Sequence, residues 1–311
     1  MNPAVTKFAL IPSRIVSLLG DYAELTKARI TTLIVLTAWC GYFFGARKAG
    51  LPTISWGLWH ALFGIGIVSS GTAALNEVLE HDVDRKMRRT ALRPIPAGRM
   101  SLLHATLVGS LLTIGGSVYL VLFCNWLTGC LTFLTAAVYL LAYTPLKTVS
   151  PICTSVGAFP GAMPCLLGWS AARGQLDWDG IVLFLILFLW QFPHFLAIAW
   201  LYREDYAKGS IRMLPVVEPD GKSTTNRILF YSVLLVPVSL VPAFIGMTGL
   251  VYTAGAMILG MTFVYFAVHL KRLQLPVTNG QSKARARQLF RCSILYLPLL
   301  FGLMMGDAIW R

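Results

Sequence analysis

The stretch SWGLWHALFGIGIVSSGTAALNEVLEHDVDRKMRRTALRP, residues 55–94, joins a long apolar run to a dense group of charges. Residues 55–76 contain no Asp, Glu, Lys or Arg, and a helix of that length can cross a bilayer. Residues 76–94 then carry four carboxylates, one histidine and five Lys or Arg. Over the 311 residues, 56% are hydrophobic and only 13% are charged, far from the balance of a soluble chain. The sequence therefore predicts a membrane protein with a concentrated polar group at the end of one span.

Apolar runs of similar length recur along the whole chain. They lack the two-residue alternation of barrel strands, so the backbone groups within the bilayer must be satisfied by helices. We predict an all-α membrane protein, with residues 1–311 forming a single domain. The nine predicted spans are 29–46, 55–76, 101–123, 126–144, 152–172, 178–201, 227–246, 250–270 and 289–310.

The basic residues predict the orientation of this bundle. Placing the N-terminus and every second loop on one side collects 22 of the 26 Lys and Arg there, and only Arg47, Lys48, Arg173 and Arg311 fall on the other. The positive-inside rule then predicts a cytoplasmic N-terminus, a periplasmic C-terminus and a cytoplasmic polar site. The first 29 residues match neither a signal peptide nor a transit peptide, which favours a bacterial inner membrane.

The net charge of +13 follows from this topology and from attraction to the anionic lipid of the bilayer. It requires no nucleic-acid partner, and we predict none.

Three oxygen-bearing side chains are spaced four residues apart at the end of the second span. Asn76, Glu80 and Asp84 would share one face of a helix that continues out of the span. Asp82 would point elsewhere unless the helix frays. An amide and two carboxylates suit Mg²⁺, which usually shares its coordination shell with substrate phosphates.

Arginines follow this carboxylate group at once, among them Arg88, Arg89 and Arg93. Guanidinium groups bind phosphate oxygens in pairs. Carboxylates that can hold a metal ion, beside guanidinium groups that can bind phosphate, indicate a diphosphate ligand. The alternative is that these charges form ordinary i, i+4 contacts on a solvated helix end, each worth a few tenths of a kcal/mol.

Two more polar segments are predicted at the same membrane face. The loop YTPLKTVSP, residues 143–151, supplies Tyr143 and Lys147. After the sixth span, residues 190–217 place His194 within the membrane and several polar side chains at its end, on what we expect to be one continuing helix. These side chains are Tyr202, Glu204, Asp205, Tyr206 and Lys208. An ionisable residue within the membrane suggests function, although His194 bonded to a carbonyl would be equally compatible with the sequence.

Taken together, NEVLEHDVD, RKMRRTALRPIPAGR, YTPLK, WQFPHF and DYAKGSIRMLPVV resemble the UbiA superfamily of membrane prenyltransferases, and within it the branch that farnesylates heme b. The resemblance extends over nearly the whole chain. It implies a helical bundle around a central, laterally open cavity, and a reaction that joins farnesyl diphosphate to a vinyl group of heme b to give heme O. One departure is that Tyr202 and Tyr206 flank Glu204 and Asp205 where quinone-directed relatives carry an Asp-x-x-x-Asp pair.

The resemblance also implies roles for individual residues. Asn76, Glu80 and Asp84, with Asp82 as a further candidate, would hold Mg²⁺ and through it the diphosphate. Lys147 would act with the first three in catalysis. His194 is the first candidate for contact with heme. The other expected substrate contacts are Arg88, Arg89, Arg93, Tyr143, Tyr202, Asp205 and Lys208. Pathway logic suggests heme A synthase or a terminal oxidase assembly as a partner.

Two other functions fit parts of the pattern. A prenyltransferase acting on a quinone precursor such as 4-hydroxybenzoate would need the same metal and diphosphate groups. A transporter of an anionic or heme-like molecule would be expected to place its charges near the membrane midplane. The charges here gather at one face, which favours the enzyme.

Overall fold

The computed structural model describes residues 17–273 and 275–310. The predicted roles of residues 1–16 and of Arg311 in topology lie outside that range. Within it the chain is helical with no strand, which confirms the predicted fold class. Residues 17–25 form a short helix. The remaining helices are α2 (Ala28–Lys48), α3 (Trp56–Asp84), α4 (Leu102–Phe123), α5 (Trp126–Val138), the π-helix η1 (Tyr139–Tyr143), α6 (Thr144–Leu146), α7 (Cys153–Arg173), α8 (Trp178–Leu201), α9 (Arg203–Lys208), α10 (Leu214–Val217), α11 (Lys222–Phe244), α12 (Leu250–Arg272) and α13 (Gly280–Ile309).

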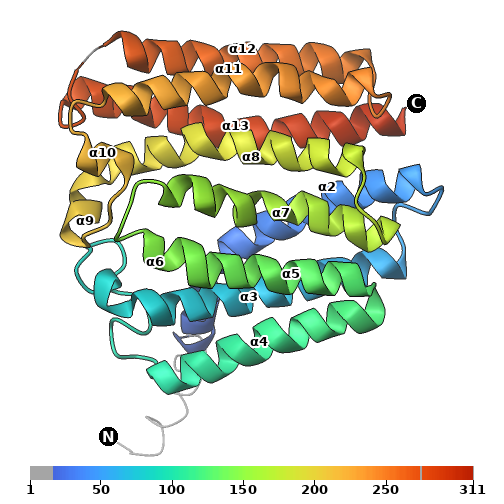
Figure 1. The fold of residues 1–311 in the computed structure, drawn as a ribbon, viewed down its shortest axis with the longest axis horizontal. Helices are drawn as coiled ribbons and strands as arrows, with labels where there is room; N and C mark the ends of the chain where they lie inside the picture. The colour runs from blue at the N-terminus through green and yellow to red at the C-terminus, as the bar shows by residue number, and fades with distance from the viewer. Residues whose placement is uncertain (1–16, 274, 311) are drawn as a thin grey trace, which may run out of the picture.

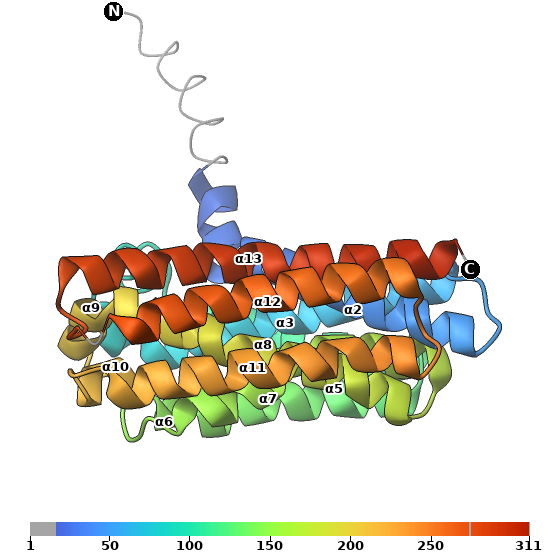
Figure 2. The same cartoon turned by 90° about the horizontal axis from the view of Figure 1, so that it is seen from above.

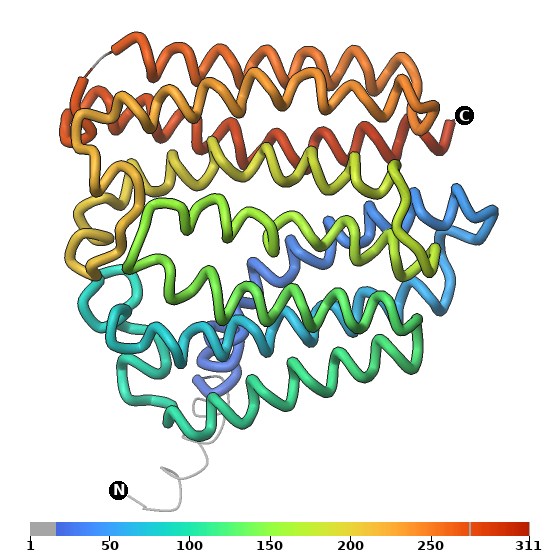
Figure 3. The backbone as a smooth tube through the Cα atoms, in the orientation of Figure 1, coloured from blue at the N-terminus to red at the C-terminus, as the bar shows by residue number. Residues whose placement is uncertain are grey.

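The long helices lie side by side along one direction, and the short helices α6, α9 and α10 gather at one end (Figures 1 and 2). We call this the polar end; it also holds the C-terminal end of α3 and the loop that follows. The backbone trace shows that α3 and α5 lie on one side of α7, and α8 lies on its other side (Figure 3). The fold therefore brings the ends of α3, α6 and α8 to the same end of the bundle, as the sequence predicted.

Eight of the described helical segments are long and apolar enough to cross a membrane, rather than the nine predicted. The difference is α7, which occupies the predicted span 152–172 but is less apolar than the others because of its Gly, Pro, Ser and Thr content. Fourteen of its 21 residues are buried against other helices. A helix surrounded by protein needs little lipid-facing apolar surface, so its lower hydropathy is compatible with its place in the bundle.

The contact between α2 and α7 depends on glycine. A Cβ atom on Gly168 would lie 1.8 Å from the carbonyl oxygen of Ala38, and one on Gly41 would lie 1.8 Å from the carbonyl oxygen of Cys165. Small residues of this kind allow helix backbones to approach closely in membranes.

Replacing Gly168 with Ala is expected to destabilise the bundle, because the new methyl group must push the α2 backbone away. Overpacking of this kind costs about 1–3 kcal/mol or more. Thermal unfolding in detergent should show a lower midpoint. The control is Gly115→Ala in α4, where a new Cβ would meet nothing within 4 Å; equal midpoints for the two variants would contradict the packing argument.

Candidate active site

The three predicted metal ligands lie on one helix at the polar end. α3 continues without a break to Asp84, so Asn76, Glu80 and Asp84 keep their four-residue spacing. Asn76 is 0% exposed and Asp84 is 1% exposed. Burial of two carboxylates and an amide is costly unless each finds a partner. The structure therefore raises the question of which groups compensate them.

Each of these three side chains contacts a different cation from a different part of the chain. Lys147, which follows α6, lies with its Nζ 2.7 Å from Glu80 Oε1. Arg93, in the loop after α3, donates to Asp84 Oδ2 at 2.6 Å. Lys27, just before α2, donates to Asn76 Oδ1 at 2.6 Å. We call these six residues the ladder; it pairs one amide and two carboxylates of α3 with three cations, and its residues come from four segments of the chain.

Lys27 is the ladder residue that the sequence did not single out. It was counted only as one of the cations that set topology. Its backbone adopts φ 48° and ψ 49°, a left-handed conformation uncommon for a lysine. Burial, and then the charges of Arg93 and Lys147, lower its pKa to about 7. Strain and an altered pKa on one side chain are typical of functional residues.

The π-helix η1 shapes the neighbouring wall of the site. Single-turn π-helices occur often at functional sites. Thr144 directly after it donates to the carbonyl of Tyr139 and accepts from Asn76 Nδ2 at 3.1 Å, which fixes the orientation of the Asn76 amide. The Lys147 ammonium lies 4.5 Å from the ring centre of Tyr143 and 6.0 Å from that of Tyr139. The tyrosine faces thus stabilise the cation that pairs with Glu80.

Asp82 lies apart from the ladder. Its side chain is 73% exposed and contacts His81 at 3.2 Å and Arg85 at 3.8 Å. This is the orientation expected two residues away from Glu80 and Asp84 on a regular helix. Buried Glu77 instead points inward: its Oε1 accepts the Ile95 N–H, and its Oε2 has no hydrogen-bond partner.

The second polar segment does not continue α8 as expected. α8 ends at Leu201, and α9 begins at Arg203 after a turn at Tyr202. This turn directs Asp205 toward the loop after α3, where its two carboxylate oxygens accept the backbone N–H groups of Arg88 and Arg89, each at 3.1 Å. The segment therefore contacts this loop directly; we call residues 85–93 the arginine loop.

Arg89 is held by the same segment. Its guanidinium lies 5.5 Å from the ring centre of Tyr202 and 5.8 Å from that of Tyr206. Arg88 and Lys208 are exposed at the polar end. We call the contacts of Asp205, Tyr202 and Tyr206 with the arginine loop the loop clamp.

Replacing Asp205 with Ala is expected to loosen the arginine loop, because two backbone amides lose a charged acceptor worth about 1.5–3 kcal/mol per hydrogen bond. Hydrogen exchange of residues 85–93 should become faster. Glu204→Ala is the matched control, since Glu204 is exposed and pairs with Lys283 of α13 instead. Unchanged exchange in the Asp205 variant would show that the clamp does not order the loop.

His194 of α8 lies apart from the ladder. Its imidazole contacts Trp190 and Phe195 of α8 and Phe290 and Ser293 of α13. Within the described part of the chain, none of them reaches the ladder.

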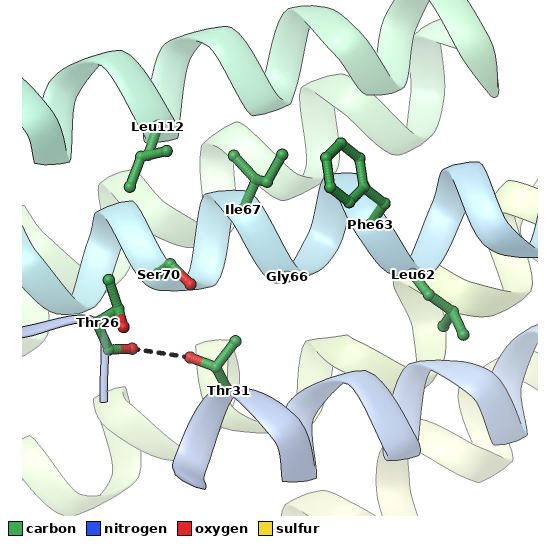
Figure 4. Close-up of a pocket in the computed structure, with 8 residues that line it drawn as sticks. All are labelled: Thr26, Thr31, Leu62, Phe63, Gly66, Ile67, Ser70 and Leu112. Carbon is green, nitrogen blue, oxygen red and sulfur yellow. Dashed lines mark hydrogen bonds between the residues drawn. The ribbon is translucent and has the colours of Figure 1, made fainter. Parts of the chain in front are cut away.

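An open groove of about 380 Å³ runs along α3 (Figure 4). Figure 4 shows its floor formed by α3, with Thr31 on one side and Leu112 on the other. Its lining is mostly apolar and contains no charged side chain: Thr26, Thr31, Leu62, Phe63, Gly66, Ile67, Ser70 and Leu112. The groove suits a hydrocarbon chain, whereas the ladder suits charged groups.

The donor set of the ladder fits Mg²⁺. It offers hard oxygen atoms from one amide and two carboxylates, and such sites commonly complete their shell with water and phosphate oxygens. Across residues 17–273 and 275–310 no three His, Cys, Asp or Glu side chains lie together as a group that could hold a metal ion, so any Mg²⁺ here would rely on the Asn76 amide and on oxygen atoms from water and substrate. Three cations beside the donors supply the complement to a diphosphate.

Comparison with known proteins identifies the class. A family model for the UbiA prenyltransferase family matches residues 34–295. The chain belongs to the UbiA prenyltransferase family, and it is a multi-span membrane protein.

Among its relatives is a protoheme IX farnesyltransferase of Koribacter versatilis, 55% identical over 307 residues that cover 99% of both chains. The protein of that name from Solibacter usitatus is 48% identical and covers 92% of this chain and 98% of its own.

Solved structures share the fold. That of a digeranylgeranylglyceryl phosphate synthase has a TM-score of 0.77 at 20% identity, covering 94% of this chain and 99% of its own. A UbiA homolog from Archaeoglobus fulgidus bound to GPP and Mg²⁺ has a TM-score of 0.59 at 15% identity, covering 91% and 99%.

Proposed function

We propose that this protein transfers the farnesyl group of farnesyl diphosphate to a vinyl group of heme b, giving heme O and releasing diphosphate. The observation that carries the proposal is the ladder, in which three oxygen donors and three cations converge in a family of prenyltransferases. The choice of acceptor is supported by the 40–55% identity to relatives named protoheme IX farnesyltransferase.

In this mechanism Asn76, Glu80 and Asp84 would hold Mg²⁺, which would neutralise charge on the leaving diphosphate. Lys27, Lys147 and Arg93 would donate to the diphosphate oxygens. Cationic donors placed where negative charge develops stabilise the transition state. The C1–O bond of the farnesyl group then breaks, and its electron pair leaves with the diphosphate.

The allylic cation is attacked by the electrons of the heme vinyl group, and a new C–C bond forms. Water adds to the resulting cation and loses a proton, which leaves a hydroxyl group on the product. Tyr143, already in contact with Lys147, presents an aromatic face to stabilise positive charge beside the diphosphate. The loop clamp orders Arg88 and Arg89 at the polar end, where Tyr202, Asp205 and Lys208 also lie, for entry of the substrate.

The acceptor is tested by incubating the purified protein with Mg²⁺, farnesyl diphosphate and either heme b or 4-hydroxybenzoate. Mass spectrometry should detect heme O. A prenylated product only with 4-hydroxybenzoate would assign the protein to the quinone-directed branch instead.

We also propose that the protein resides in a bacterial inner membrane with its polar end in the cytoplasm. This follows from the basic residues, which gather at that end. Alkaline phosphatase fused after the C-terminus should be active, because the fusion would lie in the periplasm. Fluorescence from a fluorescent protein fused at that position, together with an inactive phosphatase fusion, would show that the C-terminus lies in the cytoplasm and would contradict the proposed orientation. Transfer of heme O to heme A synthase or an oxidase assembly remains the expected next step.

A further inference from the structure

A second groove lies between α12 and α13, which pack side by side at one edge of the bundle (Figures 1 and 2). Its volume is about 390 Å³, and its walls are mostly apolar, with Leu259 and Phe266 on α12 and Leu295 and Leu299 on α13. Leu295 is 61% exposed and Leu299 is 50% exposed. Large apolar side chains exposed on a membrane helix face lipid, so the groove opens toward the hydrocarbon of the bilayer.

The groove follows one face of α13 from near the polar end into the membrane. α13 begins at Gly280 in the polar end (Figure 1), so Gln288 and Arg291 line the part of the groove nearest that end, and Leu299 lies farther into the bilayer. The rise from Gln288 to Leu299 is roughly 16 Å at 1.5 Å per residue. The hydrocarbon core of a bilayer is about 30 Å thick, so the groove has the length of an acyl chain in one leaflet.

Arg291 brings an uncompensated positive charge to this groove. Among the described residues that line it, Arg291 is the one charged side chain, and it is exposed. It falls within the predicted span 289–310, and residues 250–306 contain no Asp or Glu. A cation at this depth is costly unless an anion compensates it. The helices that form the groove offer no carboxylate near Arg291, so the compensating anion must come from outside the chain.

Three more cations of α13 lie between Arg291 and the start of the helix. Lys283 is compensated by Glu204 of α9, 2.7 Å away. Arg285 donates to Gln288 Oε1 at 3.0 Å, which holds its guanidinium beside the groove. In the part of the chain that the structure describes, Arg287 and Arg291 form no ion pair. Guanidinium groups bind phosphate oxygens in pairs, and basic pockets between transmembrane helices bind anionic lipid headgroups.

We propose that the groove between α12 and α13 binds one anionic phospholipid, with an acyl chain along Phe266, Leu295 and Leu299 and the phosphate at Arg287 and Arg291. A second copy of the chain is a poorer occupant. A two-fold interface sets the same surface against itself, and these arginines would then meet a surface that carries cations and no carboxylate. The proposal is independent of the reaction and of its acceptor.

The test is native mass spectrometry of the full-length protein, purified in detergent and freed of lipid, with phosphatidylglycerol or phosphatidylcholine of identical acyl chains. Wild type should bind the first phosphatidylglycerol more tightly, because the choline group offsets the phosphate charge. Arg291→Gln should weaken binding of phosphatidylglycerol about five-fold, the effect of one arginine at an anionic lipid surface, and leave that of phosphatidylcholine unchanged. Equal affinities of wild type for the two lipids would overturn the proposal.

Arg227→Gln is the matched control for Arg291→Gln. Arg227 is also exposed, lies at the start of the predicted span 227–246 in α11, and is outside the groove. Its affinity for phosphatidylglycerol should equal that of wild type. Equal weakening in the two variants would show that lipid is attracted by general surface charge, and would overturn the site.

The location is tested with a phosphatidylglycerol that carries a photoreactive diazirine in its acyl chain. It should crosslink to peptides of α12 and α13. Unlabelled phosphatidylglycerol should compete, whereas glycerol 3-phosphate, which has no acyl chain, should not. Crosslinks confined to other helices, competition by glycerol 3-phosphate, or a dimer whose formation excludes the lipid would each overturn the proposal. Formation of heme O is a separate readout, so the proposed function can stand while this inference fails.

Discussion

Asp84→Asn is expected to lower kcat/KM for farnesyl diphosphate by about 10³-fold, the scale of effect seen when one stabilising group for developing charge is removed. Asp84 is 1% exposed and carries the charge at the end of the ladder nearest the arginine loop. Asparagine keeps the shape of the side chain but removes that charge, so the proposed Mg²⁺ site would lose an anionic ligand and Arg93 would lose its ion pair. The measurement is the initial rate of heme O formation as a function of Mg²⁺ concentration.

Asp82→Asn is the matched control for this prediction. It makes the same chemical change two residues away, on a side chain that is 73% exposed and outside the ladder. We expect a rate within about two-fold of wild type, because exposed ion pairs contribute little. Equal losses of kcat/KM in both variants would show that the effect comes from the change in net charge at the polar end and not from the ladder. A wild-type rate and Mg²⁺ dependence in Asp84→Asn would overturn the metal assignment.

Lys27→Gln should be the next most damaging change, with kcat/KM for farnesyl diphosphate lowered by about 10²-fold. Glutamine can still donate a hydrogen bond to Asn76 Oδ1, as Lys27 does at 2.6 Å in the wild-type protein. It cannot supply positive charge to the diphosphate. Since burial and neighbouring cations lower the pKa of Lys27 to about 7, a bound diphosphate would provide the negative charge that favours its protonated form.

Arg29→Gln is the control for Lys27→Gln, because Arg29 lies two residues further along and is exposed. Its removal takes away one positive charge from the same part of the polar end but none from the ladder. Both kcat and KM should remain near wild type. Equal increases in KM for the two variants would show that Lys27 acts only by long-range electrostatic attraction of the anionic substrate.

The ladder could be predicted from sequence where one helix governs the geometry. Four-residue spacing places Asn76, Glu80 and Asp84 on one face of α3 whatever surrounds them, and the apolar run before them predicts that the helix is continuous. The same periodicity predicted that Asp82 would point away. Lys147 was identified because its loop is short and contains no other cation.

Which cation pairs with each of these three side chains could not be predicted, because the pairing depends on how separate segments meet. Lys27 looked like any cation beside a first span, and nothing local distinguishes Arg93 from Arg88 or Arg89. The turn at Tyr202 was missed because the sequence there contains no proline or glycine to end α8. That turn gives Asp205 its contacts with the arginine loop, so the role of the second segment also required tertiary structure.

The modest hydropathy of α7 has a consequence for how the chain enters the membrane during synthesis. α2 is synthesised before α7, and Gly41 of α2 packs against Cys165 of α7, which follows it by more than 100 residues in the sequence. Because the insertion machinery selects segments by apolarity, α7 is a poor candidate for insertion by itself. Its retention in the bilayer then depends on helices already present. Variants at Gly168 should therefore yield chains with inverted or missing spans, a defect of biogenesis, in addition to folded bundles of lower stability.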